Sequence, residues 1–417
     1  MARPNRLNAP LHEPRPPPIL LDLVLDLVLE FRWLTEDEDE NDDEDETQPA
    51  AMNAHPANPW ELLFPPPKTA GRTSLLKLRL LRKNGEPLLL LPTQSPAADI
   101  ALALYPAQSW KAKIARRGLA LLQKAGALPG TAPVELQLSL DSPFAQFLCP
   151  PGRRVEELTF AMLLGNPRTA GRRFVLLVFD RAGQPVRVVK AGVGSERALE
   201  LIRNEINFLK TVPAPVLHAP ALQGTFAANG IAALALEYIA GPTPALADTS
   251  SVPEILGSWL SRERPVRFAD LPVARRLAAD ARKDEATQRA LEKLNQVTVH
   301  SAIHHGDFAP WNIRIEPVTR RWVVLDWERG EPAGPPGWDW FHFVLQPEVL
   351  VRRASPETIL TRFEKLRRRP AFTRYVAQAG IQSSVDLLLL GYAIHCRDLT
   401  RQTEGMPTIE GLVERLL

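Results

Sequence analysis

The sequence has few of the residues that hold small secreted domains or zinc-bound domains together. Its 417 residues include two cysteines, Cys149 and Cys396, which cannot form a disulfide framework and fit a reducing compartment as buried thiols. No cysteine or histidine spacing typical of a zinc site is present. The formal net charge is only +2, so we expect no nucleic-acid partner. With 45% hydrophobic residues, the composition favours a globular protein of two or three modules.

Long uninterrupted hydrophobic runs of the membrane type are also missing. Residues 18–34 are apolar, but Asp22, Asp26 and Glu30 interrupt them at every fourth position along one helical face. The run is too short and too polar for a membrane span. It also lacks the charged start and the small-residue cleavage site of a signal peptide. We therefore expect a cytoplasmic protein without a membrane span.

The first 58 residues have the composition of a disordered tail. Residues 1–18 are rich in proline, and residues 36–46 are acidic at all but one position. Like charges at this density repel one another, and such a segment can bury little apolar area. We expect residues 1–58 to be disordered, and the sequence leaves open whether translation starts at Met1 or at Met52.

Residues 59–150 are predicted to form an accessory α/β module whose role the sequence does not reveal. Two strands are expected around a turn at Asn84-Gly85, and a basic amphipathic helix is expected at 109–126. The basic side chains of that helix could contact a phosphate or an anionic membrane, or simply form a solvated face. No chemical motif occurs in this module, which we expect to pack on or near the next domain.

Beyond a boundary at Pro150-Pro151-Gly152, the chain is predicted to form two lobes. The small lobe, residues 151–240, should contain strands at 173–180, 186–191 and 231–238 and one helix at 195–211. The large lobe, residues 241–417, should be mostly helical with a short β insertion at 312–327. A small β-rich lobe followed by a larger helical lobe is an α+β arrangement.

The clearest chemical pattern lies in two short segments of the large lobe. HGDFAPWN at 305–312 is followed by LDWE at 325–328. The sequence between them can pair as a β-hairpin with Asn312 and Asp326 at its open end. Because both are equidistant from residue 319, we expect them to face each other in an antiparallel pair.

These residues have the chemistry of a magnesium site beside a base. The amide oxygen of Asn312 and the carboxylate of Asp326 suit Mg²⁺, and Asp307 could orient a hydroxyl nucleophile next to them. An Asp or Asn at a strand end is more commonly a cap or turn residue. Asp326, however, follows an apolar Val-Val-Leu run, where an idle carboxylate would be costly. We expect His305 to make structural hydrogen bonds rather than to take part in chemistry.

Lys190 and Glu205 form a second predicted pair. Lys190 shares a strand face with two valines, and Glu205 lies within the apolar stripe of the helix at 195–211. A buried ion pair between them would satisfy both charges. It would either hold the lysine toward the α- and β-phosphates of ATP or serve only as a structural salt bridge.

These segments resemble the aminoglycoside phosphotransferase and choline kinase family, which has a bilobal protein-kinase-like fold. The resemblance covers about residues 155–417. HGDFAPWN resembles the catalytic loop of the family, and LDWE resembles its magnesium-binding segment. The resemblance implies Asp307 as the catalytic base, Asn312 and Asp326 as magnesium ligands, and Lys190 as the phosphate-contacting lysine.

Other parts of the family pattern are matched less closely. VVK with NEINFLK resembles the small-lobe lysine and the helix glutamate, Glu205. Asp339 resembles a downstream structural aspartate. LEYIAG resembles the hinge that receives adenine through backbone groups. The resemblance therefore implies Glu237, Tyr238 and Ile239 as adenine-binding residues. Residues 164–171, with Gly165, stand where a phosphate loop belongs, although their glycines do not form the protein-kinase GxGxxG.

The resemblance implies an ATP- and Mg²⁺-dependent enzyme that transfers the γ-phosphate to a hydroxyl of a small molecule, such as an aminoglycoside, a choline-like alcohol or a sugar. The acceptor and the oligomeric state stay open. The first alternative is a nucleotide-binding regulator that has lost transfer activity. The second, a protein kinase, is less favoured because no Ala-Pro-Glu segment follows LDWE.

Overall fold

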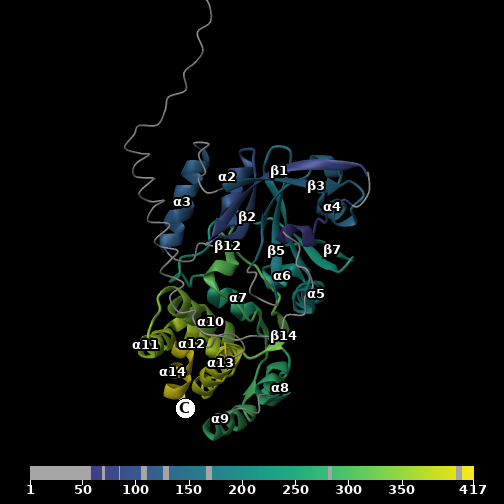
Figure 1. Cartoon of the computed structure of the whole chain (residues 1–417). Coiled ribbons are helices and arrows are strands. Elements are labelled where there is room, and N and C mark those ends of the chain that lie inside the picture. Colours follow the sequence, from purple (N-terminus) through teal and green to yellow (C-terminus); the bar gives the residue numbers. More distant parts are fainter. Residues whose placement is uncertain are drawn as a thin grey trace, which may run out of the picture.

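Figure 1 shows the chain in a computed structural model. The structure describes eight stretches, which are residues 58–67, 71–83, 85–104, 110–124, 131–165, 171–279, 284–400 and 406–417. Three predictions therefore lie wholly or largely outside the described residues. They concern the disordered tail, Asn84 in the first turn, and the central part of the candidate phosphate loop, residues 166–170.

A sheet dominates the first half of the described chain (Figure 1). It is antiparallel and has eight strands in the order β3-β1-β2-β4-β5-β6-β8-β7. The strands are β1 (Thr73–Lys83), β2 (Glu86–Pro92), β3 (Thr131–Ser139), β4 (Thr159–Leu163), β5 (Arg173–Phe179), β6 (Pro185–Val193), β7 (Leu222–Ala228) and β8 (Ile231–Glu237). The predicted strands of the small lobe correspond to β5, β6 and β8. The segment expected as an accessory module contributes β1, β2 and β3, so its strands extend the sheet of the small lobe.

Helices and short turns cover both faces of this sheet. They are η1 (Pro59–Leu62), α2 (Ala97–Ala101), η2 (Leu102–Leu104), α3 (Trp110–Lys124), α4 (Pro143–Leu148), η3 (Val155–Glu157), α5 (Glu196–Thr211) and α6 (Ala214–Leu217). One face buries a cluster with aromatic residues from η1, α4 and β4. On the other face, α2 and α3 pack near β1 and β2, while α5 covers β6 and β8. The helix expected at 109–126 is α3.

Helix α5 begins where the sequence predicts it. The Ser195 hydroxyl accepts a hydrogen bond from the Ala198 amide at 3.2 Å, which caps the first turn. The apolar stripe of the helix, including Leu201 and Phe208, then packs into the core. Glu205 lies within this stripe and has 0% of its surface exposed, so the helix carries one carboxylate into the interior.

The second half of the chain is mainly helical. It contains α7 (Val252–Ser258), η4 (Phe268–Asp270), α8 (Pro272–Ala279), α9 (Glu285–Asn295), η5 (Pro310–Asn312), α10 (Trp338–Gln346), the π-helical turn η6 (Pro347–Val351), α11 (Pro356–Arg367), α12 (Pro370–Gln378), α13 (Val385–Thr400) and α14 (Pro407–Leu416). Its short strands are β9 (Val266–Arg267), β10 (Thr298–Val299), β11 (Ala302–His304), β12 (Ile313–Ile315), β13 (Trp322–Val324) and β14 (Glu331–Gly334). The predicted α+β fold, with a β-rich part followed by a helical part, is confirmed. Among the helices of the described residues, none combines the length and the apolar character that crossing a membrane requires.

The two halves meet closely just after β8. Gly241 has a φ of 119°, and a Cβ atom there would lie 2.0 Å from the Ile315 carbonyl oxygen. Only glycine fits this approach. The Ile315 amide also donates to the Pro242 carbonyl at 2.9 Å. The segment that leaves the sheet is therefore held against β12, which carries the candidate site.

Candidate active site

The hairpin β12–β13 forms as predicted, but its register differs by one residue. Ile313 pairs with Val324 and Ile315 pairs with Trp322. At the open end, the Leu325 amide donates to the Asn312 carbonyl at 2.7 Å. Asn312 therefore lies opposite Leu325 in the ladder, and the prediction that it lies directly opposite Asp326 is wrong. Asp326 is the next residue along, at the mouth of the same hairpin.

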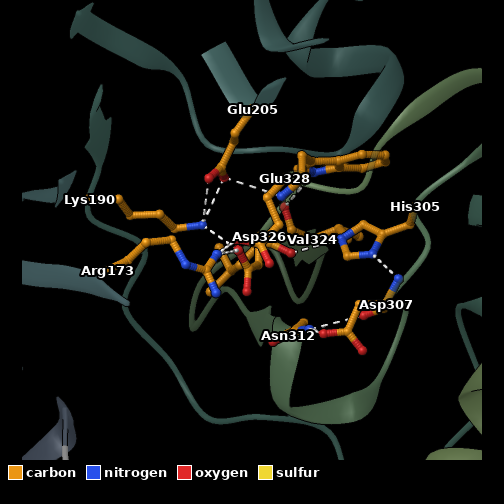
Figure 2. A network of polar contacts seen from close by, with 11 residues as sticks. Arg173, Lys190, Glu205, His305, Asp307, Asn312, Val324, Asp326 and Glu328 are labelled. Carbon is orange, nitrogen blue, oxygen red and sulfur yellow. Dashed lines mark hydrogen bonds and ion pairs between the residues drawn. The ribbon is translucent and has the colours of Figure 1, made fainter. Parts of the chain in front are cut away.

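Asp307 and Asn312 are in direct contact on the loop that enters the hairpin (Figure 2). The Asn312 side-chain amide nitrogen donates to the Asp307 carboxylate and to its backbone carbonyl, both at 2.9 Å. These bonds direct Nδ2 to Asp307, so the amide oxygen faces away from it. Burial raises the pKa of Asp307, but the hydrogen bond and the charge of His342, together with His305, outweigh this effect and bring the pKa below its usual value.

His305 is fully buried, and its two ring nitrogens are hydrogen-bonded to the backbone. Its Nδ1 accepts a hydrogen bond from the Asp307 amide at 3.1 Å, so the ring donates through Nε2 to the Leu325 carbonyl at 2.8 Å. Burial lowers the pKa of the imidazole, which keeps it neutral and preserves this pattern. One ring thus joins the HGD loop to the LDWE segment.

Asp339 holds the backbone of the same loop from α10. Its carboxylate accepts hydrogen bonds from the His305 amide at 2.8 Å and from the Gly306 amide at 3.1 Å. Asp339 is buried, with 5% of its surface exposed. Gly306 has a φ of 79°, a conformation that favours glycine and turns the chain toward Asp307.

Replacing Asp339 with alanine is expected to reduce the free energy of unfolding by about 1–3 kcal/mol for each backbone amide that stays buried without an acceptor. Asp339→Asn should lose less, because its amide oxygen still accepts one bond. Urea unfolding of both variants measures the effect. Asp270→Ala, which removes a half-exposed carboxylate, is the control. If Asp339→Ala were as stable as this control, the proposal that Asp339 stabilises the backbone of the loop would be wrong.

Lys190 joins the two halves of the molecule at the site (Figure 2). Its ammonium group lies 2.8 and 2.9 Å from the two carboxylate oxygens of Glu205, which confirms the predicted pairing. It also lies 2.6 Å from Oδ1 of Asp326. Burial lowers the pKa of Lys190, but the two carboxylates outweigh this effect, and the net shift is upward. The lysine is thus a fixed cation that reaches Asp326 from β6.

Asp326 is both charged and held in an unusual backbone conformation. Its φ is 69°, a left-handed value that is costly for a residue other than glycine and is typical of functional sites. Burial raises its pKa, but Lys190 and Arg173 outweigh this and bring it to about 2. Arg173 approaches from β5, with Nη1 4.0 Å from Asp326 Oδ1, and forms an ion pair with Glu328. The Asp326 side chain is 30% exposed, so a ligand can still reach it.

The donor set at the mouth of the hairpin fits a magnesium ion. Asn312 offers an amide oxygen and Asp326 offers an ionised carboxylate, and Mg²⁺ prefers such hard oxygen ligands while keeping several of its waters. Among the described residues, no three His, Cys, Asp or Glu side chains gather as a larger metal cluster. A magnesium ion at this place would therefore depend on few protein ligands and on the oxygens of a bound substrate.

The other predicted nucleotide-binding residues lie at the end of β8 and after β4. Glu237 ends β8, and its backbone amide already donates to the Ala221 carbonyl at 3.0 Å. Tyr238 and Ile239 follow and are half-buried. Gly165 has a φ of 68°, and a Cβ atom there would lie 2.4 Å from the backbone oxygen of Arg173, so this turn requires glycine.

The sequence interpretation missed His342. This residue on α10 lies 2.9 Å from Oδ1 of Asp307 through its Nε2 atom. A signal was present, because His342 is a lone histidine in the otherwise apolar stretch WFHFVL, where a buried polar side chain needs a partner. The partner lies 35 residues away in the sequence, so no local spacing identifies it.

No family model and no curated protein matches the sequence. Among solved structures, the chain is similar to a macrolide 2'-phosphotransferase from Brachybacterium faecium, with 16% identity, 61% of this chain and 91% of that chain covered, and a TM-score of 0.34. It is also similar to an aminoglycoside phosphotransferase from Streptomyces rimosus, with 15% identity, 57% and 89% covered, and a TM-score of 0.33.

A third similar structure is a putative fructosamine-3-kinase from Haemophilus somnus, with 12% identity, 60% of this chain and 88% of that chain covered, and a TM-score of 0.34. Similarities with TM-scores this far below 0.5 are too weak to assign a family or an activity. The function proposed for this chain therefore depends on the contacts within its own site.

Proposed function

We propose that the protein is an ATP- and Mg²⁺-dependent phosphotransferase that moves the γ-phosphate to a hydroxyl group of a small molecule. One observation carries the proposal. Lys190, held by Glu205, meets Asp326 at the mouth of the hairpin that also presents Asn312, and Asp307 contacts that asparagine. These contacts between a fixed cation and carboxylates from both halves of the molecule support the proposal.

Each group has a role that follows from its contacts. Lys190 binds the α- and β-phosphates, with Glu205 fixing its position. Asn312 and Asp326 would hold the magnesium ion, which would supply positive charge to neutralise the phosphates. Asp307 accepts a hydrogen bond from the acceptor hydroxyl and aligns it with the phosphorus atom. The segment Glu237–Ile239 receives adenine through its backbone, and Gly165 begins the loop above the phosphates.

The proposal predicts a strict requirement for magnesium. Mg·ATP should raise the unfolding temperature of the protein, and ATP with a chelator should raise it less, because Asp326 and Asn312 would hold the metal that accompanies the nucleotide. Incubation with Mg·ATP and a library of aminoglycosides, amino alcohols and sugars, followed by mass spectrometry, should yield a phosphorylated product. The chelator should abolish this product.

The same experiment tests the alternative. A thermal shift by Mg·ATP without any phosphorylated product across a broad library would favour a nucleotide-binding regulator. Neither a thermal shift nor a product would contradict both functions. Asp326→Asn is the matched variant for the metal, since it keeps the shape of the side chain and removes its charge. This variant should need a higher magnesium concentration for the same thermal shift.

A further inference from the structure

His342 lies behind the candidate base, on the side away from Asn312. Its Nε2 atom is 2.9 Å from Oδ1 of Asp307, while Asn312 contacts the other oxygen, Oδ2, at 2.9 Å. The His342 side chain is 8% exposed, and that of Asp307 is 32% exposed. Both oxygens of the Asp307 carboxylate are therefore hydrogen-bonded, and part of the group is still exposed to solvent. Each carboxylate oxygen has two lone pairs, so a further hydrogen bond from an acceptor hydroxyl can be accommodated.

A second hydrogen bond fixes the imidazole ring itself. The Tyr392 hydroxyl on α13 lies 2.9 Å from Nδ1 of His342, and Tyr392 is 2% exposed. A hydroxyl can either accept from a protonated Nδ1 or donate to an unprotonated one, so the ring stays bonded in both charge states. The ring is thus held at both nitrogens, between Asp307 and α13.

The surroundings of His342 favour its cationic form. Burial lowers its pKa, but Asp307 and Cys396 outweigh this effect and raise the pKa to about 9. The other titratable neighbours on α13 are Tyr392 and His395. The pKa of His395 is lowered to about 3, first by burial, so that ring is neutral. His342 is therefore already protonated on both ring nitrogens at neutral pH, and it cannot accept a further proton.

We propose that His342 is a positioning residue: its imidazole holds one oxygen of the Asp307 carboxylate so that the acceptor hydroxyl meets that carboxylate in a single orientation. This inference rests on the proposed phosphotransfer function. Helix α10 then fixes the loop twice, since Asp339 binds the backbone of His305 and Gly306 and His342 binds the side chain of Asp307. The two residues are three positions apart and share one helical face.

The pairing also sets how Asp307 acts. Donors from His342 and Asn312 hold both oxygens of the carboxylate in place, so its main contribution is to orient the hydroxyl. This suits phosphoryl transfer, in which the transition state is loose and positioning supplies most of the catalysis.

The kinetic test compares two replacements of His342. His342→Leu fills a similar volume but donates no hydrogen bond, and it should lower kcat by about 10²-fold while the KM for ATP stays the same. His342→Gln retains an N–H that can reach Asp307 and should recover part of the loss. Tyr375→Phe, which removes another buried hydroxyl of the helical half, is the matched control and should keep the parental kcat. A parental kcat in His342→Leu would overturn the proposal.

A second test does not require activity. In the NMR titration of the histidine side chains, the signal that His342→Gln removes should titrate well above pH 6.5 in the parent and nearer to that value in Asp307→Asn. A His342 titration that is indifferent to Asp307→Asn would also overturn the proposal. If the titration responds but the parent transfers no phosphate to any acceptor, the ion pair is upheld, and the catalytic role fails together with the proposed function.

Discussion

Asp307→Asn is expected to lower kcat for phosphotransfer by about 10²- to 10⁴-fold, the range that a positioned acid–base group supplies. The replacement keeps the size of the side chain and its contact with Asn312, but it removes the charge that aligns the acceptor hydroxyl. Binding of Mg·ATP should stay close to that of the parent, because Lys190 and Asp326 are untouched. Single-turnover kinetics with the identified acceptor and calorimetric titration with Mg·ATP measure the two quantities.

The control for this experiment is Asp270→Asn, at a half-exposed carboxylate that pairs with Arg267 at the surface. It should behave as the parent in both measurements, since exposed ion pairs contribute little. If Asp307→Asn transferred phosphate at the parental rate, the assignment of Asp307 would be wrong. If it lost Mg·ATP binding as well, its role would belong to the nucleotide site.

The buried ion pair was predictable from the sequence because each half of it violates a local pattern. Lys190 falls on an apolar strand face, and Glu205 falls in the apolar stripe of α5, so each needs a partner of opposite charge. The third member of the cluster, Asp326, was predicted as a metal ligand but not as a second partner of the lysine. That contact joins residues 136 positions apart, and it depends on how the two halves of the chain pack.

The register of the hairpin could not be read from symmetry alone. The prediction assumed a turn centred on residue 319, whereas the Glu316 amide pairs with the Arg321 carbonyl at 2.9 Å. Four residues, 317–320, therefore form the connection, and Arg320 has a φ of 61°. A connection of four residues is centred between residues 318 and 319, so Asn312 lies opposite Leu325 and not opposite Asp326.

The extension of the sheet is also a long-range property. The sequence predicted β1 and β2 as a hairpin within a separate module. Pairing of β2 with β4 brings Leu89 opposite Leu163, and this contact makes one sheet of the two segments. Each strand has apolar residues that would suit either a separate module or a shared core, so the local patterns do not decide between them.

Lys190→Met is expected to have the second large effect, on stability and on turnover together. It leaves Glu205 buried without its cation, and breaking a buried pair in this way costs about 3–5 kcal/mol. It also removes the cation that meets the phosphates, which should lower kcat by about 10²-fold or more. Urea unfolding and steady-state kinetics measure the two losses separately.

The double variant Lys190→Met/Glu205→Met separates structure from function. Because it replaces the buried pair with apolar side chains, it should regain much of the lost stability. The recovery should be incomplete, since the Trp327 amide loses Glu205 as its acceptor at 3.2 Å. Turnover should stay low, because no cation reaches the phosphates.

Arg197→Met/Glu200→Met, at an exposed pair on the same helix, controls for lost charge and should change stability by less than about 1 kcal/mol. Parental turnover in the Lys190→Met/Glu205→Met variant would show that the pair is only a structural salt bridge.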